Sequence, residues 1–322
     1  MRLGDICSKI GSGATPRGGK EAYSASGIPI IRSQNVLDWS FSSNGLAYLN
    51  DEQARTLSNV EVHQGDILLN ITGDSVARAC IVPSDVIPAR VNQHVAILRP
   101  KEKANATFIL AWLQTNKDLL LKLASSGATR NALTKRMLEG LDINLPSIDI
   151  QNHIAALISL IQSKINLNIK LNGYLLELAT TRFEQALFKS NRVVRLGDIV
   201  KLEDSKRVPL NSRDRDARKG PYPYYGATSI MDYVDDYLFD GIRVLLGEDG
   251  SVIDESGRPI LQYVWGEYWV NNHAHILAAA SDYSLEAIYI ALQRTPISHI
   301  VTGAVQRKIS QRNLNKLKLE MP

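Results

Sequence analysis

The amino-acid sequence predicts an α+β fold in which two homologous, β-rich domains are joined by one long α-helix. Motifs from the first part of the chain recur in the same order in the last part, and a proline-free run of helix-forming residues lies between the two copies. Short apolar runs bounded by glycine turns fill each copy. The expected divisions are 1–146 for the first domain, 147–191 for the helical spacer and 192–322 for the second domain.

The repeat is carried by short motifs that keep their order along the chain. Arg-Leu-Gly-Asp-Ile at 2–6 recurs at 195–199, and Val-Asn-Gln-His at 91–94 returns as Val-Asn-Asn-His at 270–273. An apolar stretch follows both Val-Asn-Gln-His and Val-Asn-Asn-His. Chance can produce one such match but hardly an ordered set, so the sequence indicates two diverged copies of one domain.

Each copy has the pattern of short strands and turns with helices toward its end. Buried strands are expected at 66–69 and 243–246, because each apolar run follows a glycine and precedes a polar glycine turn. A longer helix and then a short amphipathic helix are expected near the end of each copy. These expected helices are 107–123 and 133–141 in the first copy, and 284–294 and 309–317 in the second.

The connecting helix is expected over 148–189, where only Gly173 interrupts the helix formers and Asp149 lies near the positive end of the dipole. About 40 residues at 1.5 Å each make a helix of roughly 60 Å. Its apolar residues follow alternating steps of three and four, interrupted by Lys164 and Asn168, as in helices that pack along another long helix. This apolar seam consists of Ile154, Leu157, Ile161, Leu171, Leu175 and Leu178.

Composition places the chain among ordinary globular proteins. It has 322 residues, of which 44% are hydrophobic and 22% charged, and its net charge of +4 is compatible with a polyanionic partner. Cys7 and Cys80 are too few for a disulfide framework, so a reducing compartment is expected. No signal peptide or long apolar span is recognisable, so we expect a cytoplasmic protein that does not enter the membrane.

Motifs for catalysis are incomplete. Residues 13–20 resemble a phosphate loop, but the glycines are one residue too far apart and a carboxylate follows the lysine. Asp204 and Lys206 have the spacing of some nuclease metal sites, yet no preceding acidic partner stands in a clear motif context, so a solvated loop is expected. His273 and His275 lack further ligands, so they are interpreted as polar strand residues. The sequence therefore predicts no catalytic residue, metal or cofactor on this chain.

Polar side chains in glycine-marked loops are candidates for contacts with nucleic acid. Arg, Gln and Asn can make paired hydrogen bonds to base edges, while Lys and Arg can anchor phosphates. The candidates in the first copy are Arg17, Lys20, Arg32, Ser33, Gln34, Asn35, Arg130, Asn131 and Lys135. The candidates in the second copy are Lys206, Arg207, Arg213, Arg215, Tyr224, Tyr225, Gln306, Arg307 and Lys308. Because aspartates alternate with arginines at 213–216, a solvated, self-paired loop is the competing interpretation there.

Together these motifs resemble the specificity subunits of type I restriction–modification systems. The likeness covers essentially the whole chain and rests on motifs that are specific jointly rather than singly. They are the repeated Arg-Leu-Gly-Asp-Ile, residues 28–35, 65–73, 92–96 and 127–146 with the helix that follows, and residues 223–228, 246–250 and 269–273.

The resemblance implies two target-recognition domains, each reading one half of a bipartite site in double-stranded DNA. It also implies that the long helix spaces the half-sites and docks methyltransferase (modification) subunits, which use S-adenosylmethionine to methylate adenine. A separate motor–nuclease restriction subunit would use ATP and Mg²⁺. The specificity chain itself is expected to be non-catalytic and to bind no cofactor.

One departure from the family pattern affects the expected partners. Such subunits usually have a second long helix that pairs antiparallel with the first, whereas residues 303–322 align with 127–146 and the sequence stops where that helix would begin. The seam is therefore expected to pack on a second chain, either another copy or a segment that supplies the distal helix. Two alternatives stay open: a truncated adaptor that binds methyltransferase without selective DNA binding, and a specificity subunit of a fused nuclease–methyltransferase system.

Overall fold

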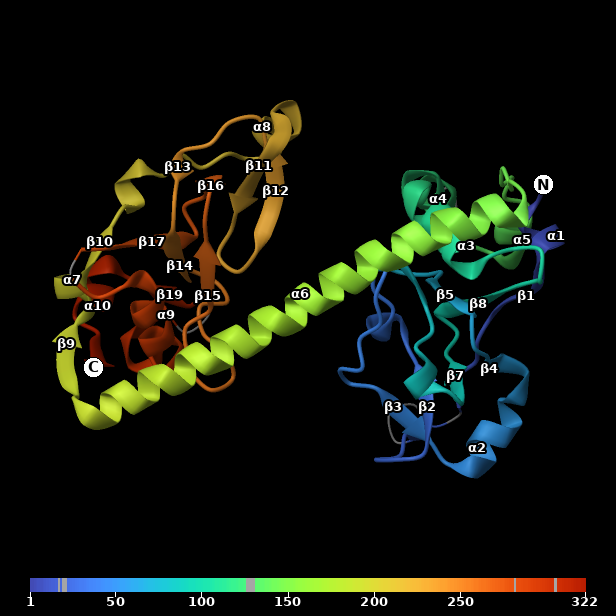
Figure 1. Ribbon diagram of the computed structural model, residues 1–322, viewed down its shortest axis with the longest axis horizontal. Helices are drawn as coiled ribbons and strands as arrows, with labels where there is room; N and C mark the ends of the chain where they lie inside the picture. Colours follow the sequence, from blue (N-terminus) through green and yellow to red (C-terminus); the bar gives the residue numbers. More distant parts are fainter. Residues whose placement is uncertain (17, 19–21, 126–130, 281, 304–305) are drawn as a thin grey trace. The chain divides into compact units, whose positions relative to one another are not determined.

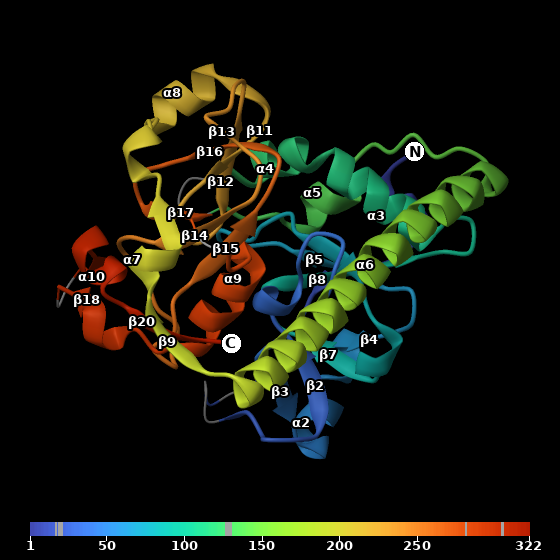
Figure 2. The same cartoon turned by 60° about the vertical axis from the view of Figure 1, so that its left-hand side comes forward.

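The computed structural model describes residues 1–322 except 17, 19–21, 126–130, 281 and 304–305 (Figure 1). Its contacts divide the chain into two compact units, Met1–Ile169 and Lys170–Pro322. The helix α6 (Ile148–Lys189) contributes to both units and runs without a break in both views (Figures 1 and 2). The predicted α+β class and the predicted bounds of the long helix are confirmed.

The first unit contains two four-stranded sheets. One is antiparallel throughout and has the order β1 (Cys7–Ser12), β8 (Val95–Pro100), β5 (Ile67–Asn70), β6 (Ala79–Ile81). The other has the order β3 (Ala47–Leu49), β2 (Ile28–Ile31), β7 (Ala89–Val91), β4 (Glu61–Val62), and its two central strands are parallel. Every residue of β5 is buried, which explains why the strand begins with three apolar residues in a row before the buried Asn70.

Short helices connect and cover these strands. The predicted helix at 107–123 is two helices, because the backbone leaves the helical conformation at Asn116. The predicted helix at 133–141 is shorter, since Thr134 caps its start and Gly140 ends it. The helices are α1 (Leu3–Ile6), α2 (Asp51–Thr56), α3 (Ala106–Thr115), α4 (Lys117–Ser125) and α5 (Lys135–Glu139), with short 3₁₀ turns η2 (Ser33–Asn35), η3 (Ser58–Val60) and η4 (Ser84–Val86).

The second unit repeats the plan. Its first sheet has the order β10 (Val200–Leu202), β17 (Ala274–Ala279), β14 (Arg243–Gly247), β15 (Leu261–Val264). Its second has the order β12 (Ile230–Val234), β11 (Lys219–Tyr225), β16 (Glu267–Val270), β13 (Phe239–Asp240). Two small sheets are β18 (Val301–Thr302) with β19 (Lys308–Ile309), and β20 (Lys318–Met321) with β9 (Arg192–Arg195). The helical segments are α7 (Leu196–Ile199), η5 (Asp204–Lys206), α8 (Ser212–Ala217), α9 (Leu285–Arg294), η6 (Ser298–Ile300) and α10 (Gln311–Asn315).

The two units can be matched residue by residue through strand register. Strand β2 runs parallel to β7 in the first unit, and β11 runs parallel to β16 in the second. In the antiparallel sheets Leu69 lies opposite Ala96, and Leu246 lies opposite His275. This match supports the repeat seen in the sequence and pairs Ala96 of the first unit with His275 of the second.

The repeated Arg-Leu-Gly-Asp-Ile motif has a packing role in each unit. Its Leu3 and Ile6, and likewise Leu196 and Ile199, are buried in the core. A Cβ on the glycine of the second copy, Gly197, would lie 2.9 Å from the Cβ of Asn315 in α10, closer than side chains normally approach. The motif therefore recurs because a short helix packs directly on its backbone.

Close backbone packing also occurs at Gly13, where the chain leaves β1. A Cβ there would lie 1.8 Å from the carbonyl oxygen of Val91. Gly13→Ala is therefore expected to destabilise the first unit by about 2 kcal/mol through overpacking. Urea unfolding should show a lower midpoint, with Gly11→Ala as the control because its Cβ would meet nothing within 4 Å. Equal midpoints for the two variants would contradict the prediction.

The helix α6 is anchored at both ends by buried residues. Near its start, Gln151 accepts a hydrogen bond from the Asn105 amide at 2.9 Å and donates one to the Pro146 carbonyl at 2.8 Å. Near its end, Phe183 is buried in the core of the second unit. Among the described residues, no helix combines the length and apolar character needed to cross a membrane.

Candidate nucleic-acid interface

Corresponding polar loops follow the central strand of the antiparallel sheet in each unit. In the first unit, the loop after β5 carries Thr72 and Gly73, and His94 precedes the neighbouring strand β8. The Thr72 hydroxyl lies 2.6 Å from Nδ1 of His94. The His94 amide donates to the side chain of the buried Asn92 at 3.1 Å. The repeated Val-Asn-x-His motif thus places an imidazole beside the loop.

The second unit builds the same arrangement with one different side chain. Asp249 takes the place of Thr72, and its carboxylate lies 2.6 Å from Nδ1 of His273. The His273 amide donates to the side chain of Asn271 at 2.7 Å. Gly73 and Gly250 both have the positive φ angles, 75° and 79°, that favour glycine. The two loops therefore have a similar backbone conformation at this glycine and differ in the side chains that they present.

An open pocket of about 380 Å³ lies at this place in the first unit. It is lined by Ser33, Gln34, Thr72, Gly73, Asp74, Ser75, Arg78 and His94. The buried Asn70 holds the η2 turn next to the loop by donating to the carbonyl of Ser33 at 2.9 Å and to that of Val36 at 3.2 Å. Exposed amide, guanidinium and carboxylate groups converge here with half-buried hydroxyl groups, and such groups can read the edges of bases.

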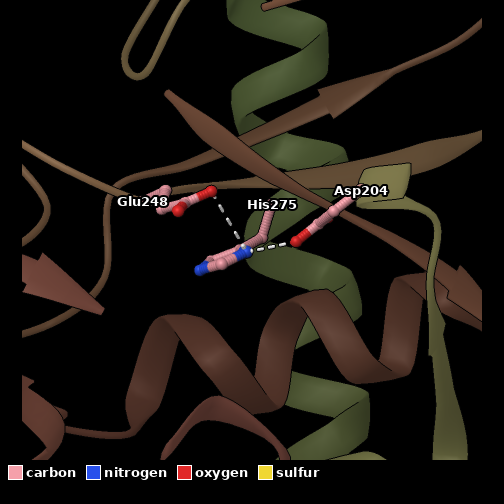
Figure 3. Close-up of side chains that lie close together, drawn as sticks. All are labelled: Asp204, Glu248 and His275. Carbon is pink, nitrogen blue, oxygen red and sulfur yellow. Dashed lines mark hydrogen bonds and ion pairs between the residues drawn. The ribbon is translucent and has the colours of Figure 1, made fainter. Parts of the chain in front are cut away.

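Below the corresponding loop of the second unit lies a buried polar network, and the described residues at the matching positions of the first unit do not repeat it. Asp204, Glu248 and His275 lie close together, with Nδ1 of His275 2.6 Å from the Asp204 carboxylate and 3.7 Å from Glu248 (Figure 3). Nε2 of His275 lies 2.9 Å from the carbonyl of Ile309. By strand register, the positions of Asp204, Glu248 and His275 correspond in the first unit to Ser12, Ile71 and Ala96.

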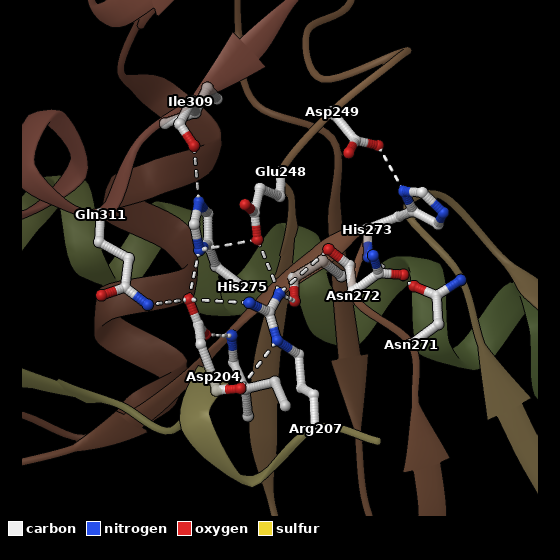
Figure 4. A network of polar contacts seen from close by, with 12 residues as sticks. Asp204, Arg207, Glu248, Asp249, Asn271, Asn272, His273, His275, Ile309 and Gln311 are labelled. Atoms are coloured by element: carbon white, nitrogen blue, oxygen red, sulfur yellow. Dashed lines mark hydrogen bonds and ion pairs between the residues drawn. The ribbon is translucent and has the colours of Figure 1, made fainter. Parts of the chain in front are cut away.

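Further donors complete the network (Figure 4). Asp204 accepts hydrogen bonds from the Ile276 amide at 2.8 Å and from Gln311 at 2.6 Å. Arg207 donates to Glu248 and to the carbonyl of Ala274, each at 2.7 Å. At the loop itself, Lys308 pairs with Glu248 at 3.2 Å. The network therefore ties η5, β17, β19 and α10 to the base of the polar loop.

The carboxylates of this network are held in their charged forms. Burial by itself would raise the pKa of Asp204, but hydrogen bonds from His275 and the Ile276 amide, with the nearby Arg207, lower it below the usual value. Burial would likewise raise the pKa of Glu248, and the hydrogen bond from Arg207 and the attraction of His275 lower it. The buried charges thus compensate one another.

The same three residues could in principle hold a cation, because their ligand atoms all lie within 4.8 Å of one another. However, Nε2 of His275 faces a carbonyl oxygen and must donate a proton there, while Nδ1 faces a carboxylate. Arg207 and Gln311 already donate to the carboxylates. The arrangement is that of an internal ion-pair network, in which a metal would have to displace several donors.

The expectation that Asp204 belongs to a solvated loop is wrong. Its residue is 5% exposed, because its carboxylate turns inward toward His275, while Lys206 pairs with Glu203 at 2.6 Å. The two groups of the nuclease-like spacing therefore do not point to one site. His273 and His275 also face different carboxylates, Asp249 and Asp204.

Several predicted residues of the first unit meet at the pocket. Ser33 and Gln34 line it, and the exposed Asn131 accepts a hydrogen bond from the Gly73 amide at 3.2 Å through its carbonyl. Arg32 donates to the carbonyl of Gly45 and lies over the ring of Tyr23 at 5.6 Å. Lys135 is exposed and pairs with Glu139 within α5. Three more predicted residues, Arg17, Lys20 and Arg130, lie outside the described residues.

Asn35 has a role different from the predicted base contact. It is fully buried, and its side chain accepts from the Arg32 amide at 3.0 Å and donates to the carbonyls of Ser42 at 2.9 Å and Asn44 at 3.2 Å. Its amide is therefore used in shaping the loop that presents Ser33 and Gln34.

Predicted residues at the start of the second unit are mostly engaged internally. Arg207 belongs to the buried network, and Arg215 donates to the carbonyl of Leu210 and to Asp232, at 2.8 and 3.3 Å. The self-paired interpretation does not describe Arg215, because its partner lies on β12 rather than beside it. Arg213 is exposed on α8.

The tyrosines of β11 also differ from expectation. Tyr224 is 1% exposed, and its hydroxyl accepts from the Leu210 amide at 2.9 Å. Tyr225 is half-buried against Tyr268, with ring centroids 5.7 Å apart. Tyr224 is therefore a core residue and not a surface contact, because β11 occupies the central position that the apolar β2 has in the first unit.

At the other end of the second unit, the predicted Gln306, Arg307 and Lys308 are all exposed. The carbonyl of Arg307 accepts from the Gly250 amide at 3.0 Å, as that of Asn131 does from Gly73. The predicted residues Asn131 and Arg307 therefore lie beside the polar loops of the first and second units. The loop residues themselves, including Thr72, Arg78, His94 and Asp249, were missed, although the repeated histidine motif marked their position.

The six seam residues of α6 lie on its surface. Their exposed fractions range from 37% for Ile154 to 63% for Leu157 and Ile161. Leu171, Leu175 and Leu178 are each slightly more than half exposed. Within the part of the chain that the structure describes, none of the six is buried.

Comparisons with known proteins agree with this architecture. The chain is similar to a protein of Haemophilus influenzae assigned as a type I restriction enzyme specificity subunit, with 29% identity over 127 residues, which cover 39% of this chain and 32% of that subunit. It is also 20% identical to the protein of Methanocaldococcus jannaschii assigned as the MjaX specificity subunit, over 99% of this chain and 82% of that one. The crystal structure of a type I restriction–modification S subunit from M. genitalium has a similar fold, with a TM-score of 0.51 and 14% identity over 99% of this chain and 83% of that one.

The family model described as "Type I restriction modification DNA specificity domain" matches residues 1–175 and 189–322. The two matched segments include the polar loops of both units and nearly all of the chain. The chain therefore belongs to the family of type I restriction–modification DNA specificity domains.

Proposed function

We propose that the chain is the sequence-specific DNA-recognition subunit of a type I restriction–modification complex, and that each of its two domains reads one half of a bipartite site. The observation that carries this proposal is the pair of corresponding polar loops. Both units hold a histidine and a positive-φ glycine at the same places, but one loop presents Thr72 and the other Asp249. Equal scaffolds with unequal polar groups suit the reading of two different half-sites.

In the first domain, the pocket residues Gln34 and Arg78 are the base-reading candidates. Both are exposed, and an amide can make paired hydrogen bonds to adenine as a guanidinium can to guanine. In the second domain, Asp249 offers a carboxylate, which can accept from the amino group of cytosine. Arg307, Lys308 and Lys135 are proposed phosphate contacts, because they are exposed cations on or near these surfaces.

In this proposal the chain itself catalyses no reaction. Methylation and restriction belong to the partner subunits, which would bring S-adenosylmethionine and, for restriction, ATP and Mg²⁺. The long helix α6 is the element to which methyltransferase subunits would dock, because it presents an unusual amount of exposed apolar surface.

Selection of bound sequences from a random DNA pool, with methyltransferase subunits present, tests this function. The expected result is enrichment of two short half-sites separated by several unread base pairs. A single continuous motif would contradict bipartite reading. Methyltransferase binding without any enrichment would instead support the adaptor alternative.

A further inference from the structure

One largely buried arginine reaches both segments that form the polar loop of the second unit (Figure 4). The side chain of Arg207 is 13% exposed, and its Nε donates to the carbonyl of Asp204 in its own turn at 2.9 Å. Its Nη1 donates to the Glu248 carboxylate and to the Ala274 carbonyl, each at 2.7 Å. The same nitrogen also donates to the Asn272 carbonyl at 3.3 Å. One guanidinium therefore links three segments of the chain.

The acceptors of Arg207 lie next to the two side chains that the loop presents. Glu248 directly precedes Asp249 in the chain, and the two carbonyl acceptors belong to the residues on either side of His273. The Asp249 carboxylate lies 2.6 Å from Nδ1 of His273, whose side chain is still 45% exposed. Arg207 thus holds the backbone on both sides of this pair from beneath the surface.

The first unit satisfies the matching carbonyl without a side chain. Strand register makes Val95 the counterpart of Ala274. The Val95 carbonyl accepts from the backbone amide of Gly13 at 3.1 Å. In the second unit this place is taken by Arg207, and its guanidinium has further donors for Glu248. The sheet itself therefore needs a donor at this carbonyl but not an arginine, and the reach to the loop is a feature of the second unit.

We infer that Arg207 is a positioning residue for sequence recognition, which holds the Asp249 carboxylate and the His273 imidazole in the relative position that faces the second half-site. The inference rests on the proposed function and extends it, because Arg207 is assigned no contact with DNA. A guanidinium suits this role, since its donors lie in one rigid plane and can hold acceptors on separate segments at once. A lysine ammonium on its flexible stem lacks that fixed geometry.

Arg207→Lys keeps the positive charge and removes the planar set of donors. In the random-pool selection, base preference at the second half-site is expected to fall roughly 10-fold, because the reading groups lose their fixed position. Preference at the first half-site should not change, since every acceptor of Arg207 lies in the second unit.

Arg243→Lys is the matched control. The side chain of Arg243 is 23% exposed and donates to the Glu203 carboxylate and the Ile242 carbonyl, each at 2.7 Å. Arg243 begins strand β14, whereas the polar loop follows the end of that strand. The same substitution therefore changes another partly buried ion pair of the same unit, and it should leave the preference at both half-sites unchanged.

Hydrogen exchange tests the positioning without DNA. The amides of Glu248 and Gly250 donate to carbonyls of the two neighbouring segments, at 2.8 and 3.0 Å. In Arg207→Lys these two amides are expected to exchange roughly 10-fold faster, because the loop opens more often once its buried donor is lost. In Arg243→Lys they should exchange at the original rate. Circular dichroism of both variants would show that the second unit is folded under the conditions of the measurement.

Unchanged base preference in Arg207→Lys would overturn the proposal, even if the two amides exchange faster. Equal loss of preference in Arg207→Lys and Arg243→Lys would also overturn it, as would loss of the folded second unit in Arg207→Lys, since either result would assign Arg207 to stability alone. If the unaltered chain enriches no bipartite sequence, the proposed function fails instead. Hydrogen exchange would then still show whether Arg207 holds the loop.

Discussion

His275→Ala is expected to destabilise the second unit by about 3–5 kcal/mol, the range for breaking one partner out of a buried ion pair. The variant would leave Asp204 with its charge buried and without its imidazole at 2.6 Å, and the Ile309 carbonyl without its donor. Chemical denaturation followed by circular dichroism would measure the change. His275→Asn is the control, since its amide can still donate to Asp204, and it should recover part of the loss.

The first unit shows how this part of the fold works without the network. Ser12 and Ala96 are found where the second unit has Asp204 and His275. Asp204→Ser combined with His275→Ala should therefore be less destabilising than the two single changes added together. Strict additivity in this cycle would show that the pair is not coupled and would contradict the assignment of His275 as the partner of Asp204.

The pH dependence follows from the lowered pKa values of the two carboxylates. The pKa values of Asp204 and Glu248 in the folded state lie below their ordinary values of 3.8 and 4.5. A lowered folded-state pKa contributes stability above the ordinary value, and this contribution is lost as the pH falls through the folded-state value. The denaturant concentration at the unfolding midpoint of the second unit should therefore decrease as the pH is lowered below about 4.5. This decrease should be smaller in the double variant.

Periodicity in the sequence was sufficient to predict the helix and the repeat. The run of helix formers in α6 can be recognised within one segment, and each copy of Arg-Leu-Gly-Asp-Ile buries its own leucine and isoleucine in the core of its unit. Residue type alone could not separate exposed from buried polar groups. Asn35 and Tyr224 have the chemistry of DNA contacts, but partners brought from other segments bury them.

The site residues that were missed depend on long-range pairing. Thr72 meets His94, and Asp249 meets His273, only because β5 and β14 pair with the strands that follow those histidines. The repeated Val-Asn-x-His motif marked one side of each contact. The loop on the other side has different side chains in the two copies, so that comparing the copies conceals it.

Replacing Gln34 and Arg78 together by alanine is expected to relax base preference at one half-site and to leave the other unchanged. Each paired hydrogen bond to a base is worth about 1–3 kcal/mol of discrimination, so the loss should appear as roughly 10-fold or greater loss of preference at the positions read. Repeating the random-pool selection with this variant would measure it. The pocket residues lie in one unit only, which is why the effect should be confined to one half-site.

Asp249→Ala is the matched variant in the second unit, and it should relax the other half-site alone. Lys135→Ala serves as a control for phosphate contacts, since the loss of an exposed cation should weaken binding to all sequences alike. Equal loss of preference at both half-sites in either loop variant would contradict separate reading by the two domains. A selective loss in each would show that the corresponding loops, built on one backbone plan but carrying Thr72 in one copy and Asp249 in the other, read different sequences.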